Sequence, residues 1–89
     1  MVGDLNLNQL RVFYYTVRCG GITLASEALS ISQPAVSMQI KALEAHYEVA
    51  LFVRKKRKLQ LTETGKRLYQ VAEKIFGLVA EAEQVLEDK

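Results

Sequence analysis

The stretch SISQPAVSMQIKALE, residues 30–44, decides the fold because it sets a helix start directly behind a short turn. Ser32 is a strong N-cap, since its hydroxyl can accept a hydrogen bond from a free backbone N–H of the first turn. Pro34 is the only proline in the chain, and the first turn tolerates it because N–H groups there have no helical partner to lose. We therefore predict a helix that starts at Ser32.

This helix should bury one face in the core and expose an opposite face whose side chains are mostly small. The buried face is expected at the spacing i, i+4, i+7 and i+11, on Val36, Ile40, Leu43 and Tyr47. At about 100° per residue, the opposite arc contains Pro34, Met38 and Lys41, with Gln33 and Ser37 beside it. Hydrogen-bonding groups and small side chains therefore gather in the first two turns of the outward surface.

Two helices are predicted before this one. The first has Asn6 as its N-cap and ends at Gly20 and Gly21. Its apolar stripe consists of Leu7, Leu10, Tyr14 and Val17, with Phe13 beside it. The second runs from about Thr23 to Leu29 and presents Leu24, Ala25, Ala28 and Leu29, after which residues 30–32 turn the chain.

A hairpin and a long helix should follow. Residues 49–53 and 59–61 are rich in Val, Leu and Phe, and RKKRK (residues 54–58) separates them, so two short strands joined by a basic turn fit best. Thr62 then caps a helix from about Glu63 to Leu86. The expected fold is mainly α: a winged helix-turn-helix in residues 1–62 (helix-turn-helix about 22–41, wing about 51–61) and a long C-terminal dimerisation helix in residues 63–89.

Composition indicates a single globular domain. The 89 residues are 49% hydrophobic and 25% charged, as in soluble proteins with one core. The longest apolar run, IFGLVA, is far shorter than the ~18 residues of a membrane span, and MVGDLNLN contains no apolar signal segment. The single cysteine, Cys19, excludes an internal disulfide. We expect a cytoplasmic location and no membrane partner.

The net charge of +2 conceals an uneven distribution. Residues 41–67 contain eight basic and three acidic side chains, a local charge of +5, whereas residues 68–89 contain two basic and five acidic ones, a local charge of −3. A basic patch indicates a polyanionic partner. A merely solvated charged surface is the alternative that charge alone leaves open.

The sequence contains no candidate residues for catalysis or metal binding. His46 and Cys19 lie in separate predicted elements, with no second ligand at metal spacing from either. His46 is most simply a solvated residue that favours the end of a helix dipole, and Cys19 a small buried or half-buried side chain. The five glycines form no phosphate-binding loop. We therefore expect neither an enzyme nor a cofactor.

Two helices around a tight turn, followed by a basic hairpin, are typical of DNA-binding modules. Glutamine can pair with adenine, serine with a base or a phosphate, and proline or alanine can touch a thymine methyl. Ser32 could act only as a cap, Met38 only as an exposed filler, and RKKRK only as a solubilising turn of a protein-binding module. The candidate DNA-binding residues are Thr23, Ser32, Gln33, Pro34, Ala35, Ser37, Met38, Lys41, Arg54, Lys55, Lys56, Arg57 and Lys58.

The long helix carries its own apolar seam. Steps of three and four residues, the pattern of a coiled coil, connect Leu68, Val71, Ile75, Leu78, Ala82 and Val85, and the seam is widened by Ala72, Val79 and Leu86. A homodimer would cover these residues and set two recognition helices about one DNA turn, or a multiple, apart. Packing entirely within its own domain is the alternative.

These residues together resemble the amino-terminal DNA-binding domain of LysR-type transcriptional regulators. The matching segments, in the family's order and spacing, are LNQLRVFYYTV, TLASEALSISQPAVSMQIKALE, ALFVR and LTETG. The resemblance implies sequence-specific binding to double-stranded promoter DNA by a dimer, or by a dimer of dimers in the full-length protein. It implies DNA contacts at Ser32, Gln33, Pro34, Ser37, Met38 and Arg54. It also implies a C-terminal effector domain, absent here, that holds any small-molecule inducer.

Four positions depart from the family pattern. Met38 stands where arginine is common, which leaves a guanine contact open, and Ile22 stands where phenylalanine is common. Glu48 replaces a frequent glycine, so we expect a less favourable helix end there. Val53 stands where an acid is frequent, and the wing is therefore expected to be more positive than usual.

Overall fold

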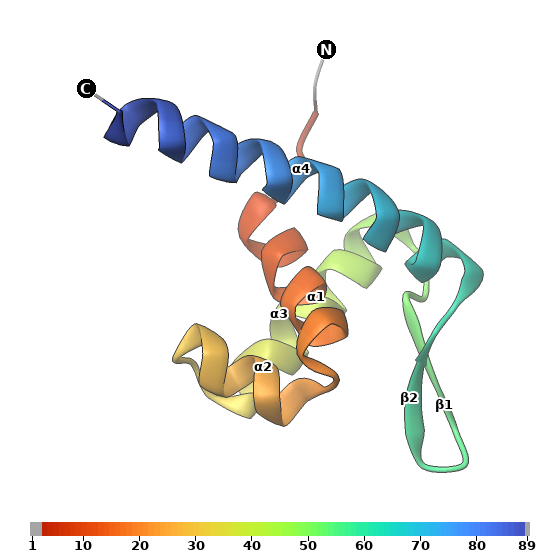
Figure 1. Cartoon of the computed structure of the whole chain (residues 1–89). Coiled ribbons are helices and arrows are strands. Elements are labelled where there is room, and N and C mark those ends of the chain that lie inside the picture. The colour runs from red at the N-terminus through yellow and green to blue at the C-terminus, as the bar shows by residue number, and fades with distance from the viewer. Residues whose placement is uncertain (1–2, 89) are drawn as a thin grey trace.

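A computed structural model describes residues 3–88 and shows four helices and one antiparallel hairpin over that range (Figure 1). In chain order they are α1 (Leu7–Cys19), α2 (Ile22–Leu29), α3 (Gln33–Tyr47), β1 (Phe52–Lys55), β2 (Lys58–Leu61) and α4 (Glu63–Glu87). This element order confirms the predicted mainly α, winged helix-turn-helix fold. Within residues 3–88, no helix is both long and apolar enough to cross a membrane.

All three predicted N-caps are confirmed. The side chains of Asn6, Ser32 and Thr62 each accept a hydrogen bond from the backbone N–H three residues further on, at 3.0–3.1 Å. These bonds satisfy donors that have no partner inside the helix. The starts of α1, α3 and α4 are therefore encoded locally.

The helix ends use left-handed backbone. Gly20 ends α1 with φ 92°, as predicted, whereas Ser30 and Glu48 end α2 and α3 with φ 57° and 53°. A side chain makes this conformation costly, by roughly 1–2 kcal/mol per residue. Glu48 thus occupies a position that suits glycine, in agreement with the expectation from the sequence.

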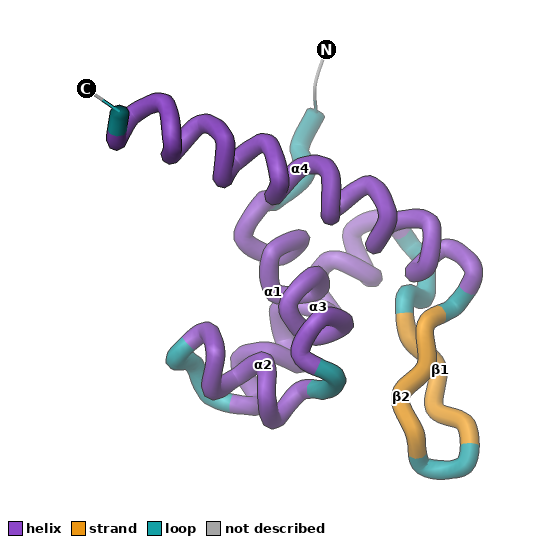
Figure 2. Tube along the Cα trace, in the orientation of Figure 1, coloured by secondary structure: helices purple, strands orange, loops and turns teal. Residues whose placement is uncertain are grey.

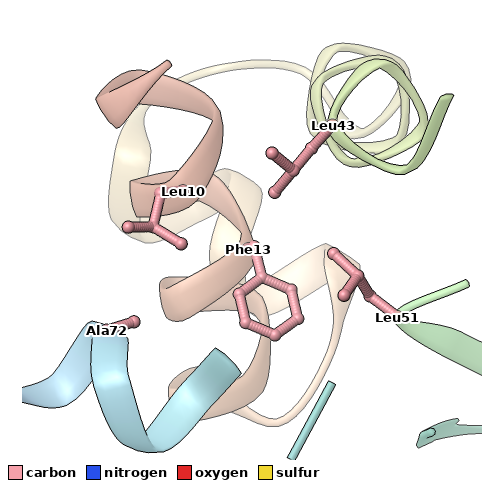
Figure 3. Packing of buried hydrophobic residues seen from close by; sticks show 5 residues of the cluster. All are labelled: Leu10, Phe13, Leu43, Leu51 and Ala72. Carbon is pink, nitrogen blue, oxygen red and sulfur yellow. The ribbon is translucent and has the colours of Figure 1, made fainter. Parts of the chain in front are cut away.

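The α1 helix is central to the core, since it contacts α2, α3 and α4 (Figure 2). One cluster of buried residues joins α1 to α3, the start of the wing and α4 (Figure 3), and consists of Leu10, Phe13, Leu43, Leu51 and Ala72. The other lies between α1, α2 and α3 and consists of Val12, Ala25, Val36 and Ile40. Phe52 packs against both clusters, and its ring centroid lies 5.5 Å from that of Phe13.

The hairpin differs from the prediction. Its strands are residues 52–55 and 58–61, instead of 49–53 and 59–61, and only Lys56 and Arg57 form the turn. Both turn residues have positive φ, 52° and 65°, which matches the twist that two-residue hairpins favour. The boundaries were wrong because neither turn residue is one of the usual Asn, Asp or Gly.

Some apolar side chains predicted to face the core lie outside it. Tyr47 was expected on the buried face of α3 but is 46% exposed, because it lines an open apolar pocket with Leu43 and Leu68 and is not covered there. Leu7 and Leu24 are also exposed, as is Ala28. The α2 helix buries only a narrow strip, since one side of it is open to solvent.

The first half of α4 belongs to the body of the domain. Leu68, Tyr69, Ile75 and Phe76 pack against the core cluster, while Ala72 is fully buried in it. The Tyr14 ring lies 5.5 Å from that of Tyr69 and 5.1 Å from that of Phe76. A hydrogen bond with Tyr69, with Tyr14 and Glu73 nearby, raises the pKa of Arg18.

Candidate nucleic-acid interface

The α2–turn–α3 unit holds the first turns of α3 outward. Residues 30–32 make the turn, and the N–H of Ile31 closes the end of α2 on the carbonyl of Ser26 at 3.0 Å. The cap on Ser32 then redirects the chain into α3, where Pro34 fills the second helical position. Val36 and Ile40 anchor the opposite side of α3 in the core. The first two turns are therefore rigidly placed.

The outward surface of these turns is largely free of charge. Gln33 and Pro34 are exposed, Ser37 is half-buried, and Met38 is 69% exposed. Ala35 is half-buried, and its backbone N–H donates to the hydroxyl of Ser32. Small and amide side chains here leave the backbone accessible to a flat or grooved partner.

The wing lies beside this surface, so that residues far apart in sequence share one hollow. The hollow has a volume of about 520 Å³. Its walls are Gly21, Ile22, Thr23, Gln33, Pro34, Ser37, Arg54 and Leu59. Thr23 and Arg54 thus join the predicted residues of α3, and Lys41 and Arg54 both line an adjoining hollow.

The rest of the wing is a row of exposed cations. Arg54 and Lys55 lie on β1, Lys58 lies on β2, and Lys56 and Arg57 form the tip. All five are exposed. Their charges add to +5 over five consecutive residues, a density that attracts phosphate anions.

Glu44 connects α3 to the wing, a role that the sequence analysis missed. Its Oε2 accepts hydrogen bonds from the backbone N–H of Leu51 at 2.7 Å and of Phe52 at 3.3 Å. These donors lie at the start of the hairpin, so the carboxylate fixes where the wing leaves the body. An acid on the buried stripe of α3, four residues after Ile40, was the available signal.

Glu44→Ala is expected to lower the free energy of unfolding by about 2 kcal/mol, because two partly buried N–H groups lose a charged acceptor. Glu44→Gln keeps one oxygen acceptor and should recover about half of that loss. Urea denaturation followed by circular dichroism measures both. The control is Glu27→Ala on the exposed side of α2, expected within about 0.5 kcal/mol of the parent; equal losses at both positions would contradict the assigned role.

The predicted dimer residues of α4 fall into two groups. Ala72 is fully buried in the chain's own core and has no surface left for a partner, and Leu68 and Ile75 are half-buried there. The others point into solvent and are Val71, Leu78, Val79, Ala82, Val85 and Leu86. Most of the first half of the seam therefore packs into the core of the domain, and its second half is exposed to solvent.

The two residues considered for other chemistry lie apart from this surface. His46 is exposed in the last turn of α3, as predicted, and Cys19 is half-buried at the end of α1. In the described part of the chain, no three His, Cys, Asp or Glu side chains are grouped closely enough to hold a metal ion.

The chain is similar to known proteins over the residues that form this surface. Residues 7–66 match the family model of bacterial regulatory helix-turn-helix proteins, lysR family. The HTH-type transcriptional regulator CfxR of Cupriavidus necator is 46% identical over 83 residues, which are 93% of this chain and 26% of that protein. The chain thus spans about a quarter of the length of the curated relatives it matches.

Two solved structures share the fold. The BenM DNA-binding domain in complex with catB site 1 DNA superposes with a TM-score of 0.85 at 31% identity, covering 94% of this chain and 93% of that one. The CbnR DNA-binding domain–DNA complex gives a TM-score of 0.79 at 28% identity, covering 94% and 97%. Both were solved with DNA.

Proposed function

Because this chain belongs to the lysR family of bacterial regulatory helix-turn-helix proteins and forms a DNA-binding domain of that family, we propose that α3 reads the major groove while the wing holds the adjacent backbone. The hollow shared by Gln33, Ser37 and Arg54 carries this proposal. It sets uncharged hydrogen-bonding groups beside a cation, which matches base edges flanked by phosphates.

Each side chain of α3 then has a distinct role. Gln33, exposed in the first turn, can donate to and accept from an adenine edge, and Pro34 can touch a thymine methyl. Ser37 can reach a base or a phosphate. Met38 supplies an apolar contact, since its thioether offers no strong donor. Thr23 and Lys41, at the two edges of the hollows, suit the phosphates on either side.

The wing supplies affinity that is largely independent of sequence. Arg54 on β1 is the wing cation that shares the hollow with α3, and it is suited to the edge of the minor groove. The remaining wing cations are suited to phosphates and are Lys55, Lys56, Arg57 and Lys58. Since Glu44 fixes the start of the hairpin, both contact surfaces keep one relative position.

We further infer that residues 63–89 act as a linker helix that dimerises the chain, with residues 1–62 reading one half-site each. The exposed apolar side chains beyond Phe76 support this division. A transcription regulator of this kind would act on promoter DNA as a dimer or a dimer of dimers, with any inducer bound by a further domain of the whole protein.

Salt dependence tests the proposal directly. If a dimer neutralises about six phosphates, log K against log salt should fall with a slope near −5. Fluorescence anisotropy on a duplex selected from a random DNA pool, across a range of salt concentrations, measures it. A slope near zero would contradict DNA binding and favour a winged-helix module that binds protein.

Gln33→Ala is expected to relax base preference at one position per half-site, at a cost of about 1–3 kcal/mol for the preferred base pair. The slope with salt should stay unchanged, because no cation is removed. Competition with duplexes that differ at single base pairs measures this. Gln39→Ala, an amide removed from the same helix outside the hollow, is the matched control. Equal losses for all base pairs would contradict a reading role.

A further inference from the structure

The second half of α4 leaves the body of the domain, and its direction is set by contacts made earlier in the helix. Within residues 3–88, Phe76 is the last residue of α4 that packs against the core cluster, and residues 77–88 are all exposed. Figure 1 shows this part of α4 running beyond the rest of the domain. The distance along the helix from Phe76 to Glu87 is about 16 Å, at roughly 1.5 Å per residue.

The start of α4 is fixed at one point. The N–H of Thr62, which caps the helix, donates to the backbone oxygen of Leu51 at 3.0 Å. Gly65 lies against the same oxygen, with no room for a side chain. A helix held at one point can still tilt about it, so a second contact further along must set the direction of α4.

The second contact is a stack of aromatic rings built on Tyr14 of α1. The Tyr14 ring centroid lies 5.5 Å from that of Tyr69, with only 21° between the ring planes, and 5.1 Å from that of Phe76. Both distances are typical of attractive ring pairs. Tyr69 and Phe76 are seven residues apart, so they lie on the same side of α4. One side chain of α1 thus contacts two successive turns of α4.

Two neighbours on α1 hold the Tyr14 ring in place. The ring of Tyr15 meets it edge-on, with 5.6 Å between the centroids. The guanidinium carbon of Arg18 lies over it, 5.9 Å from the centroid, as a cation–π contact. These five side chains, here called the Tyr14 stack, join α1 to α4 and are Tyr14, Tyr15, Arg18, Tyr69 and Phe76.

We infer that Tyr14 is a positioning residue for DNA binding, because its contacts with Tyr69 and Phe76 set the separation of the two recognition helices in the dimer. The inference rests on the dimer proposed above. Phe76 lies about midway between Gly65 and Glu87, so a shift of about 2 Å at Phe76 becomes about 4 Å at Glu87. That exceeds the rise of one base pair, about 3.4 Å. An intact stack therefore selects one separation of half-sites, whereas a loosened stack accepts several.

The preference for one half-site separation tests this role. The probes are two duplexes that carry the half-site selected from a random DNA pool, one at the separation that the parent binds best and one with two base pairs inserted. The parent should bind the first duplex about tenfold more tightly. Tyr14→Ala should reduce this ratio to below about threefold, because α4 is no longer held in one direction. Fluorescence anisotropy gives both affinities, and a uniform loss of affinity cancels in the ratio.

Two controls separate positioning from stability. Tyr14→Phe keeps the ring and should keep the ratio near about tenfold. Val12→Ala removes buried methyl groups from the other core cluster, so it should lower the melting temperature by about 5 °C or more while the ratio stays near about tenfold. A ratio that falls as far in either control as in Tyr14→Ala would overturn the role assigned to the Tyr14 ring.

Phe76→Ala tests the same stack without altering α1. Phe76 is half-buried at the edge of the core, and its loss leaves Tyr14 with one ring of α4, so the ratio should again fall below about threefold. Circular dichroism checks that the variant folds, and a folded variant with the parent's ratio would overturn the inference. A parent chain that binds neither duplex would contradict the proposed function, whereas a parent dimer that binds both equally would contradict only the role of Tyr14.

Discussion

Arg54→Ala combined with Lys56→Ala is expected to weaken DNA binding by the dimer about a thousandfold at ~0.15 M salt, whatever the sequence of the duplex. Four phosphate-facing cations are lost per dimer, two from each wing. Each cation displaces roughly 0.9 of a condensed counterion, so the slope of log K against log salt should rise from near −5 to near −2. Anisotropy titrations at several salt concentrations give both quantities.

The control for this prediction removes a cation from another surface. Arg11→Ala takes one charge from the exposed side of α1, outside both the wing and α3, and should change affinity less than about threefold. The dimer Kd should be unaffected by the wing pair, because neither residue lies on α4. Equal losses from Arg11→Ala would show that net charge, and not the wing, governs binding.

The second large effect concerns two glycines of one helix that should respond in opposite directions. Gly65→Ala is expected to lower the free energy of unfolding by about 3 kcal/mol. A Cβ at Gly65 would lie 2.9 Å from Cδ2 of Leu61 and closer still to the backbone oxygen of Leu51. That oxygen accepts the N–H of Thr62 at 3.0 Å and cannot move without breaking the join between hairpin and helix.

Gly77→Ala is the matched variant. A Cβ at Gly77 meets no atom within 4 Å, and alanine is favoured over glycine in an exposed helix interior by about 1 kcal/mol. The free energy of unfolding should therefore rise by about that amount. Urea denaturation of both variants at one protein concentration gives the comparison, and a loss of stability in both would contradict the contact assigned to Gly65.

The caps were predictable because each depends on a bond within four residues. Ser32 and Thr62 each indicate a helix start, because a hydroxyl is followed by helix-forming residues. The structure shows both expected hydrogen bonds. The order of the elements followed from these starts and from the apolar spacing between them. The buried positions at the centre of α1 and α3 also followed, since Leu10, Val36 and Ile40 lie in the core.

What could not be predicted depends on contacts across loops. Glu44 bonds to backbone seven and eight residues away, past an irregular segment whose path no local rule describes. Tyr47 has the spacing of the buried face of α3, but it is exposed because burial depends on which elements cover a helix face and not on spacing alone. The hairpin turn was misplaced because Lys56 and Arg57 adopt positive φ without the residues that usually signal it.

The open second half of α4 has a consequence for how much protein a cell must make. If only the dimer covers both half-sites, then at concentrations well below its Kd the amount of dimer grows with the square of total chain, so doubling expression raises it about fourfold. Promoter occupancy would then respond to abundance more steeply than simple one-site binding allows. The twelve residues from Gly77 to Asp88, all exposed in the single chain, would thus set the dose at which regulation begins.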